Sequence, residues 1–393
     1  MVKISKRIEN LSGYAFAEIE QKVSELKNFG ISPIDFGVGD PIDPTPEIIR
    51  QELKIAVDRH QSSGYPSYIG NQNFRQEIAR FSKNRFGIEL DPEKEICSTI
   101  GSKEAVFHFP LAFVDTGDVV ISVTPGYPPY IRGTSFAGGE NFLLSLKKEN
   151  NFLPDLSEIP EEIAERAKIF WINFPGNPTG AVAPDVFFRD IIDFCHKWDI
   201  ILASDECYTE IFFDSSNRPR SVLEFSKENI ITFHSLSKRS NMTGYRIGWV
   251  AGDDKIVSSF KKIKTNIDSG TPDFIQDAAS AALRDEIHVE KMRQKYAERK
   301  NILLETFRNL NFPIFDPPAT FYIWQQAPVN MTGIEFAKKL LDPKIGIVVT
   351  PGEFISENIN GENPGKNFVR FALVPDEKTT KIAAEKISQN FNG

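Results

Sequence analysis

Polar side chains capable of chemistry follow an apolar segment near the middle of the chain. Residues 229–237 read NIITFHSLS and include Ser235 and Ser237, and Lys238 follows directly. A lysine whose stem starts in buried structure has a lowered pKa, and its neutral amine attacks carbonyl groups. Arg246, Ser235 and Ser237 together offer hydrogen bonds to a phosphate. These residue types predict a site for a phosphorylated aldehyde cofactor, although a strand that ends in a solvated lysine has the same sequence pattern.

A second apolar segment, residues 200–206, contains an acid near its end, Asp205. A carboxylate at the end of a buried strand is costly unless it is paired. A carboxylate that keeps a pyridine nitrogen protonated makes the ring an electron sink, and Tyr208 is placed to reach the hydroxyl oxygen of such a ring. An aspartate that caps the next helix is the alternative interpretation.

Two turns after apolar segments carry further candidates. The prolines and glycines of residues 173–180, NFPGNPTG, predict a rigid turn that directs Asn177 toward the cofactor, with a plain turn as the alternative. Ser102 and Lys103 open a helix after a strand, where backbone N–H groups bind phosphate well. An ordinary N-cap at Ser102 is the competing interpretation.

Tyr127 and Arg370 complete the set of candidates. Tyr127 lies in TPGYPPY after an apolar strand and is placed to stack on an aromatic ring, although loop tyrosines often only pack. Arg370 lies in the apolar segment NFVRFALV, where a guanidinium needs an anionic partner. A substrate carboxylate bound by two parallel hydrogen bonds would supply that partner, and a structural salt bridge is the alternative.

These residues need a frame that brings them together, and the middle of the chain predicts one. Short apolar segments with strand character alternate with helical patterns such as 184–198; the segments are 98–100, 118–123, 168–174, 200–206, 229–237 and 246–252. This alternation predicts an α/β fold with a mostly parallel sheet between helices. Ligands of such sheets bind at the carboxyl ends of the strands, where the candidates lie.

The length of 393 residues exceeds what one hydrophobic core usually supports, so we expect two domains. After about residue 285 the pattern changes to a long amphipathic helix, 286–309, followed by segments typical of antiparallel strands, among them 346–352 and 367–374. We therefore predict a large cofactor-binding domain over 45–285. A smaller α+β domain would combine 1–44 with 286–393.

The order and spacing of these motifs resemble those of class I aminotransferases, which are fold-type-I pyridoxal-phosphate enzymes. The resemblance covers nearly the whole chain and rests on DFGVGDPIDPTPEI, SGYPSYIGNQNFRQEIARF, GSKEAV, PGYPPY, NFPGNPTG, SDECYTEI, SLSKRSNMTGYRIGW and FVRFALV. It implies that the central sheet has seven strands. It also implies a homodimer with shared active sites.

The resemblance assigns a role to each candidate residue. Lys238 would form a Schiff base with pyridoxal 5'-phosphate and later move a proton, and Asp205 would pair with the pyridinium nitrogen. Asn177 and Tyr208 would hold the ring oxygen, while Tyr127 stacks on the ring. The phosphate would be held by Ser102, Lys103, Ser235, Ser237, Arg246 and, from the neighbouring subunit, Tyr65. The substrate carboxylate would meet Gly39, Asn173, Asn177 and Arg370.

The reaction implied is a two-step exchange of an amino group between an amino acid and a 2-oxo acid. Within the family, GYAFAEI, GSKEAVFHFPLAFV and KTNIDSGTPDFIQDAA resemble LL-diaminopimelate aminotransferases, with 2-oxoglutarate as the implied acceptor. Tyr14 and residues 265–276 would then line the substrate pocket. The loop between Tyr65 and Gly70 lacks the acid expected there for a distal ammonium, and Phe274 stands where a polar residue would help. Aromatic, alanine or aspartate-type substrates therefore stay open, as does a carbon–sulfur lyase on the same scaffold.

Composition restricts the other function classes. A formal net charge of -8 gives no electrostatic attraction to nucleic acid or anionic lipid. The three cysteines are widely spaced and the five histidines form no ligand cluster, so we expect no disulfide framework and no metal. No apolar stretch reaches the roughly 20 residues of a membrane span. We expect a cytoplasmic enzyme.

Overall fold

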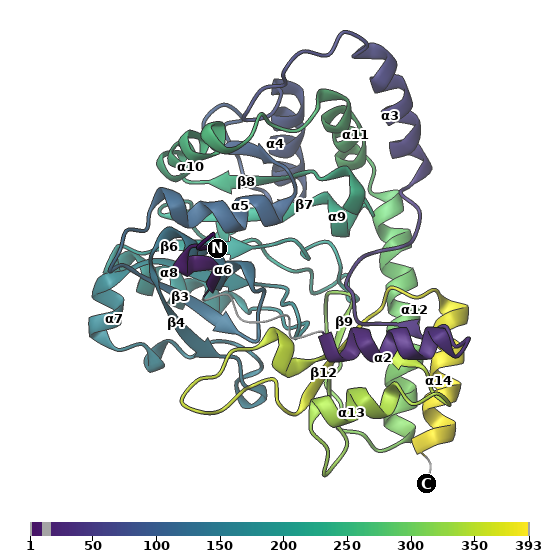
Figure 1. Cartoon of the computed structure of the whole chain (residues 1–393). Coiled ribbons are helices and arrows are strands. Elements are labelled where there is room, and N and C mark those ends of the chain that lie inside the picture. The colour runs from purple at the N-terminus through teal and green to yellow at the C-terminus, as the bar shows by residue number, and fades with distance from the viewer. Residues whose placement is uncertain (1, 10–16, 392–393) are drawn as a thin grey trace.

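A seven-stranded sheet lies at the centre of the computed structural model, which describes residues 2–9 and 17–391 (Figure 1). In spatial order its strands are β2 (Ile96–Thr99), β8 (Gly248–Gly252), β7 (Ile230–Ser235), β6 (Ile201–Asp205), β5 (Ala167–Asn173), β3 (Val119–Thr124) and β4 (Glu140–Ser145). The strands from β7 to β4 run parallel, and β8 is antiparallel to both β7 and β2. The prediction of a mostly parallel, seven-stranded sheet between helices is confirmed.

Both faces of this sheet are buried, which explains why its inner strands are mostly apolar. On β5, Ile169 and Trp171 pack in one cluster with α5 (Ser102–His108), α6 (Pro129–Ala137) and α10 (Asp254–Ile267). Phe170 and Ile172 pack in another cluster with α4 (Gln72–Phe86), α8 (Asp185–Trp198) and α11 (Asp273–Arg284). Continuous apolar strands are typical of parallel sheets covered on two sides. The helices around this sheet are α3 (Glu47–Arg59), α4 (Gln72–Phe86), α5 (Ser102–His108), α6 (Pro129–Ala137), α7 (Glu161–Arg166), α8 (Asp185–Trp198), α9 (Leu236–Arg239), α10 (Asp254–Ile267) and α11 (Asp273–Arg284).

A second, smaller unit follows the long helix α12 (Ile287–Asn309). Its antiparallel sheet has the order β11 (Thr350–Pro351), β12 (Phe368–Ala372) and β9 (Tyr322–Gln326), and α13 (Gly333–Leu340) and α14 (Glu377–Phe391) pack with it around a separate apolar core. The segment 346–352, expected as one strand, divides between this sheet and β10 (Ile347–Val348).

The N-terminal part of the chain packs on this smaller unit. Strand β1 (Ile34–Asp35) pairs in parallel with β10, and Leu26 of α2 (Ala17–Asn28) contacts Leu341 and Val348. Figure 1 shows α2 in the same lower part of the molecule as α13, whose last turn is followed by Leu341. These contacts are those that a small domain built from 1–44 and 286–393 requires; the domain boundaries themselves stay a prediction.

The remaining elements are short. They are α1 (Lys6–Glu9) and the 3-10 helices η1 (Phe109–Ala112), η2 (Lys148–Asn150), η3 (Leu156–Glu158), η4 (Val222–Glu224), η5 (Thr243–Tyr245) and η6 (Gly352–Ile355). Among the helices in residues 2–9 and 17–391, none is long and apolar enough to cross a membrane.

Candidate active site

One cavity of about 400 Å³ lies at the carboxyl ends of β5, β6 and β7. Its lining contains most of the residues singled out from the sequence: Gly39, Ser102, Lys103, Tyr127, Asn173, Asn177, Asp205, Tyr208, Ser235, Ser237, Lys238, Arg246 and Arg370. It also contains residues that sequence reasoning missed, including Val38, Cys207, Thr243 and Tyr322. The strand order therefore brings together side chains that lie up to more than 300 positions apart in the chain.

Lys238 points its amine into this cavity from the short helix α9. Strand β7 ends at Ser235, whose hydroxyl accepts a hydrogen bond from the Ser237 N–H and so starts the helix. The Lys238 Nζ donates to the Gly39 carbonyl oxygen at 2.6 Å and lies 5.4 Å from the centre of the Phe321 ring. Because its only hydrogen bond in the described structure is to a carbonyl, this amine makes no ion pair there and can approach a ligand.

Asp205 lies on the same cavity and is only 4% exposed. Its Oδ2 accepts a 2.6 Å hydrogen bond from the Tyr130 hydroxyl, and its Oδ1 accepts one from the Cys207 N–H at 3.1 Å. Burial raises the pKa of Asp205, while these hydrogen bonds and the charge of Lys238 act in the opposite direction. A buried carboxylate that faces a cavity in this way is matched to a cationic group in the ligand.

Tyr130 is a site residue that the sequence analysis did not find. Its ring stacks on Trp171 with the ring centres 4.8 Å apart, and burial raises the pKa of its hydroxyl well above the usual value. It lies at the start of α6, three positions after Tyr127, which precedes the helix.

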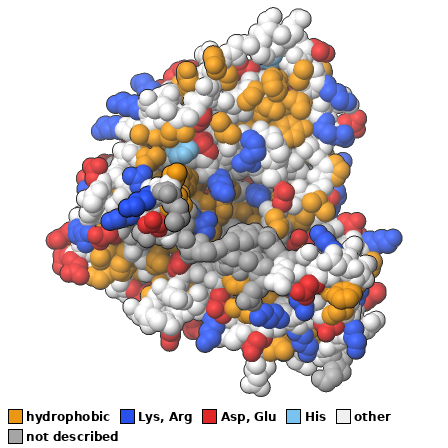
Figure 2. All heavy atoms as spheres, viewed as in Figure 1, with side chains coloured by type: hydrophobic (Ala, Val, Ile, Leu, Met, Phe, Trp, Pro, Cys, Tyr) orange, Lys and Arg blue, Asp and Glu red, His pale blue; other side chains and the backbone are white. Residues whose placement is uncertain are grey.

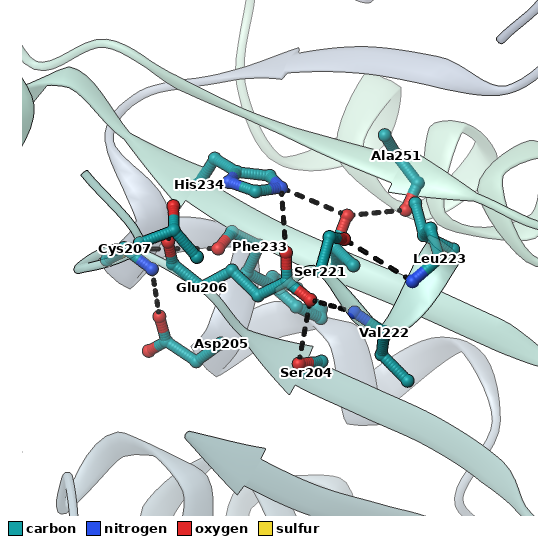
Figure 3. Close-up of polar contacts among 12 residues, drawn as sticks. Ser204, Asp205, Glu206, Cys207, Ser221, Val222, Leu223, Phe233, His234 and Ala251 are labelled. Carbon is teal, nitrogen blue, oxygen red and sulfur yellow. Dashed lines mark hydrogen bonds and ion pairs between the residues drawn. The ribbon is translucent and has the colours of Figure 1, made fainter. Parts of the chain in front are cut away.

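A second buried acid, Glu206, follows Asp205 but makes a different set of contacts (Figure 3). Its Oε1 accepts from the Val222 N–H at 2.9 Å and the Ser204 hydroxyl at 3.1 Å, and its Oε2 lies 3.7 Å from the His234 Nε2. Burial raises the pKa of Glu206 to about 8 and lowers that of His234 to about 3. Both groups are therefore neutral near pH 7. They add no charge next to Asp205 that would change its interaction with a ligand.

One end of the cavity is rich in anion-binding groups. Ser102 and Lys103 occupy the first positions of α5, and Ser235, Ser237 and Arg246 line the same cavity. The preceding Gly101 has φ +71, and a Cβ there would collide with the Arg246 guanidinium. Glycine at this position therefore allows the arginine to approach the N-terminus of α5, where backbone N–H groups favour an anion.

Arg370 reaches the cavity from β12. Its Nη1 donates to the Asn177 Oδ1 and its Nη2 to the Gly37 carbonyl oxygen, both at 2.9 Å. It makes no ion pair with any residue in 2–9 or 17–391, and its buried Nε has no hydrogen-bond partner there. The structural salt bridge considered from the sequence is thus not seen in the described chain, and the guanidinium is available to an anionic ligand.

Tyr322 contacts both Arg370 and Tyr208. The Arg370 guanidinium lies 4.5 Å from the centre of its ring, and its hydroxyl lies 3.2 Å from that of Tyr208. A Cβ on Gly39 would collide with the Tyr322 hydroxyl, which explains why glycine occurs there. Arg370 pairs with Trp324 and Ala372 pairs with Tyr322, so Tyr322 is the diagonal neighbour of Arg370 across the two strands.

Asn173 connects two of these strands and the turn that follows β5. Its Nδ2 donates to the Asp205 carbonyl oxygen at 2.8 Å, and its Oδ1 accepts from the Asn177 N–H at 2.7 Å. Asn173 therefore holds the turn 173–180 in the position that brings the Asn177 amide to Arg370.

Two candidates are not among the described lining residues. Tyr65 does not line this cavity and is 88% exposed. Tyr14 falls outside the described residues. No group of histidine, cysteine and acidic side chains in the described chain is arranged to hold a metal ion.

The cavity fits a phosphorylated pyridine aldehyde. It has an amine for the carbonyl group, a buried carboxylate for a ring nitrogen and an aromatic side chain, Tyr127. Its anion-binding end suits a phosphate, and its volume is typical of small-molecule sites. The unpaired Arg370 leaves room for a second anionic group, such as a substrate carboxylate.

Comparison with known proteins agrees with this chemistry. The family model of class I and II aminotransferases matches residues 31–387. LL-diaminopimelate aminotransferases of Aquifex aeolicus and Halothermothrix orenii are each 43% identical to the chain, covering 98% of it and 99% and 97% of their own lengths. An aminotransferase from Neisseria meningitidis superposes with a TM-score of 0.91 at 32% identity, covering 99% of this chain and all of that one.

The amine, carboxylate and anion-binding end of the cavity thus occur in a chain that the family model matches over most of its length. Such enzymes use pyridoxal phosphate to exchange an amino group between an amino acid and a 2-oxo acid, as the sequence analysis predicted. The chain belongs to the class I and II aminotransferases.

Proposed function

We propose that the chain transfers the amino group of LL-diaminopimelate to a 2-oxo acid, with 2-oxoglutarate as the acceptor. The observation that carries the proposal is a cavity that combines Lys238, Asp205 and the unpaired Arg370 in a chain 43% identical to named LL-diaminopimelate aminotransferases. The likeness extends over nearly the full length of both chains, so the loops around the cavity are included in it.

The site residues have distinct roles in this proposal. When bound, pyridoxal phosphate supplies a carbonyl group for the amine exchange and a ring that accepts electrons. Lys238 would hold that carbonyl, and its freed amine would take the proton from the substrate Cα and later return it to the ligand. Asp205 keeps a proton on the ring nitrogen, and Tyr208 and Asn177 donate to the ring oxygen. Tyr127 covers the face of the ring.

Two further groups of residues orient the ligands. We assign the phosphate to Ser102, Lys103, Ser235, Ser237 and Arg246, which line one end of the cavity. The α-carboxylate of the substrate is assigned to Arg370, with Asn173 and Asn177 beside it and Gly39 leaving space for its approach. A bidentate pair between guanidinium and carboxylate fixes the orientation of the Cα–H bond toward Lys238.

Tyr130 tests the role of Asp205 through its one hydrogen bond to that carboxylate. Tyr130→Phe removes the hydroxyl and keeps the ring that stacks on Trp171. We expect the affinity for pyridoxal phosphate and the turnover to fall about 5- to 20-fold, since a hydrogen bond to a charged group contributes about 1.5–3 kcal/mol, part of which water replaces. Equilibrium binding of the cofactor to apoprotein and steady-state kinetics measure both effects.

Tyr296→Phe is the matched control for Tyr130→Phe. Tyr296 is also buried, and its hydroxyl has no hydrogen-bond partner in the described structure. We expect this variant to bind the cofactor and turn over like the wild type. Equal behaviour of the two variants would show that the Tyr130 hydroxyl does not support Asp205.

The choice of substrate is tested by a screen of the first half-reaction. Mixing the holoenzyme with single amino acids and following loss of the visible cofactor band should give a fast response to LL-diaminopimelate. We expect slow responses, by about 100-fold or more, to alanine, aspartate and aromatic amino acids, because a site built for extra polar groups discriminates strongly against analogues that lack them.

A different pattern in this screen would identify the alternatives. Asp205 is the only acid in the described lining of the cavity, and residues 66–69 contain no acid, so a carboxylate for the distal ammonium must come from elsewhere in the assembly. A fast response to aromatic, alanine or aspartate-type substrates alone would refute the diaminopimelate proposal. Release of ammonia and pyruvate without a 2-oxo acid would identify a carbon–sulfur lyase instead.

We propose further that two copies of the chain form a homodimer with shared sites. Support comes from exposed apolar side chains: Ile48, Ile55 and Val57 of α3, together with Tyr65 and Tyr68 in the loop that follows. Figure 2 shows apolar side chains gathered over the region where Figure 1 labels α3 and α11. In the dimer, Tyr65 would reach the cofactor phosphate of the other copy.

A cytoplasmic location is part of the same proposal. The three cysteines, Cys97, Cys195 and Cys207, are all buried and form no disulfide. Free buried cysteines are typical of proteins from reducing compartments.

A further inference from the structure

Lys264 is a buried lysine outside the active-site cavity, and its contacts connect several segments that lie near that cavity. Lys264, near the end of α10, is 1% exposed, and its Nζ lies 2.7 and 2.8 Å from the two carboxylate oxygens of Asp268. It also lies 3.6 Å from the Glu104 Oε1. A buried cation between two carboxylates loses its hydration, so removing one member leaves uncompensated charge.

Asp268 also forms a hydrogen bond within the segment that follows α10. Its Oδ1 also accepts a 2.7 Å hydrogen bond from the Gly270 N–H. Gly270 has φ +84, and a Cβ there would lie 2.6 Å from the Ser67 carbonyl oxygen. The segment after α10 is therefore packed closely on the segment that contains Tyr65 and Tyr68.

A second set of bonds joins the same two segments. The Gln276 side chain accepts from the Asn71 N–H and donates to the Thr271 carbonyl oxygen, both at 2.7 Å. The Asn71 Nδ2 donates to the Asp273 Oδ1 at 3.0 Å. Hydrogen bonds and close packing thus join residues 67–71 to residues 268–276. These two segments, together with Tyr65 just before the first, are called the paired loops below.

Glu104 connects Lys264 to the anion-binding end of the cavity. It lies on α5, two positions after Ser102, and its Oε2 accepts from the Ile100 N–H at 3.1 Å. Figure 1 shows α10 beside α5, and the two helices are in contact. Lys264 therefore joins the paired loops to the helix whose first turn carries Ser102 and Lys103.

We propose that Lys264 is a positioning residue for the aminotransferase reaction. Its ion pairs with Asp268 and Glu104 fix the position of the paired loops relative to α5. The position of the paired loops in turn determines where Tyr65 contacts the cofactor phosphate of a second copy of the chain. Tyr65 and Tyr68 project from the paired loops, are exposed and do not line the cavity of their own chain. The inference rests on the shared site proposed above.

The test compares Lys264→Met with Lys300→Met in the holoenzyme. Lys300 is also buried and ion-paired, with the Asp316 Oδ1 at 2.6 Å, but it lies on α12 and has no bond to the paired loops. Both variants should lower the Tm by several degrees, because each leaves a carboxylate without its cation. Lys264→Met alone should weaken pyridoxal-phosphate binding and raise the substrate KM about 10-fold or more, with a smaller change in kcat.

A double-mutant cycle with Tyr65→Phe separates positioning from general destabilisation. If Lys264 acts through Tyr65, the losses in cofactor affinity of the two single variants should not multiply in Lys264→Met/Tyr65→Phe. Asp268→Asn, which keeps a side-chain oxygen for the Gly270 N–H, is the milder second variant should Lys264→Met fail to fold. It should show the same non-additivity with Tyr65→Phe.

The outcomes that overturn the inference differ from those that overturn the proposed dimer. If sedimentation shows a dimeric wild type and Lys264→Met matches Lys300→Met in cofactor affinity and KM, Lys264 is only structural. Multiplicative losses in the cycle lead to the same conclusion. A monomeric wild type would overturn the shared site and the positioning role together.

Discussion

Lys238→Ala should abolish transamination and the visible absorbance of the bound cofactor. The amine has no carboxylate partner in the described structure, and its contact with the Gly39 carbonyl oxygen aims it at the cavity. Alanine removes both the covalent attachment point and the group that moves the Cα proton. We expect turnover to fall at least about 10⁴-fold, since a positioned acid–base group alone contributes about 10²- to 10⁴-fold. Steady-state kinetics and absorbance of the reconstituted protein measure the two losses.

Lys103→Ala is the control for this prediction because Lys103 is another lysine of the same cavity. Its expected contact with the phosphate involves the backbone N–H, which alanine keeps. Treatment with borohydride followed by mass spectrometry should show irreversible attachment of the cofactor in the wild type and in Lys103→Ala, and none in Lys238→Ala. Attachment at another lysine with normal turnover would overturn the assignment.

The sequence predicted the central sheet well because its strands are buried on both faces. Strands β3, β5, β6 and β7 are mostly apolar and almost entirely buried, and such segments stand out from amphipathic helices. Strand β4 was not predicted. It lies at the edge of the sheet, most of its residues are partly exposed, and an edge strand therefore shows a weaker apolar pattern.

Strand direction and pairing were harder to predict than strand identity. Nothing in RIGWVAG reveals that β8 runs against β7, because direction depends on where α9 and η5 turn the chain. The segment 346–352 was expected as one strand, yet β10 pairs with β1 and β11 pairs with β12. Such pairings depend on partners more than 300 and about 20 positions away, respectively, which local patterns do not encode.

The site residues were also predicted in part: those at strand ends were found, and those that act through contacts between elements were not. Residues that end predicted strands, such as Asp205 and Lys238, were found because the frame places strand ends together. Tyr130 and Tyr322 were missed because each acts through a contact between elements: Tyr130 reaches Asp205 from α6, and Tyr322 reaches Arg370 from a neighbouring strand. In the sequence both are aromatic residues in apolar surroundings, where packing is the usual role.

Asp205→Asn is the second change from which we expect a large effect. The amide has the shape of the carboxylate and can still accept from the Cys207 N–H, so the fold around it should persist. It cannot hold a proton on the cofactor ring nitrogen by charge, so the ring loses much of its capacity to accept electrons. We expect turnover to fall about 10²- to 10³-fold, as when other preorganised electrostatic groups are removed, and cofactor affinity to fall with it.

Glu206→Gln is a closely matched control, since it makes the same chemical change at the next residue. Glu206 is as buried as Asp205, but its carboxyl group contacts Val222 and Ser204, and burial raises its pKa to about 8. Near pH 7 it is already protonated, so the amide removes no charge and turnover should stay within about 3-fold of the wild type. If both variants lost turnover equally, the loss would reflect a disturbed strand end. If only Asp205→Asn lost turnover, the charge on Asp205 would be responsible, because the two adjacent acids at the end of β6 receive the same chemical change and differ in their surroundings.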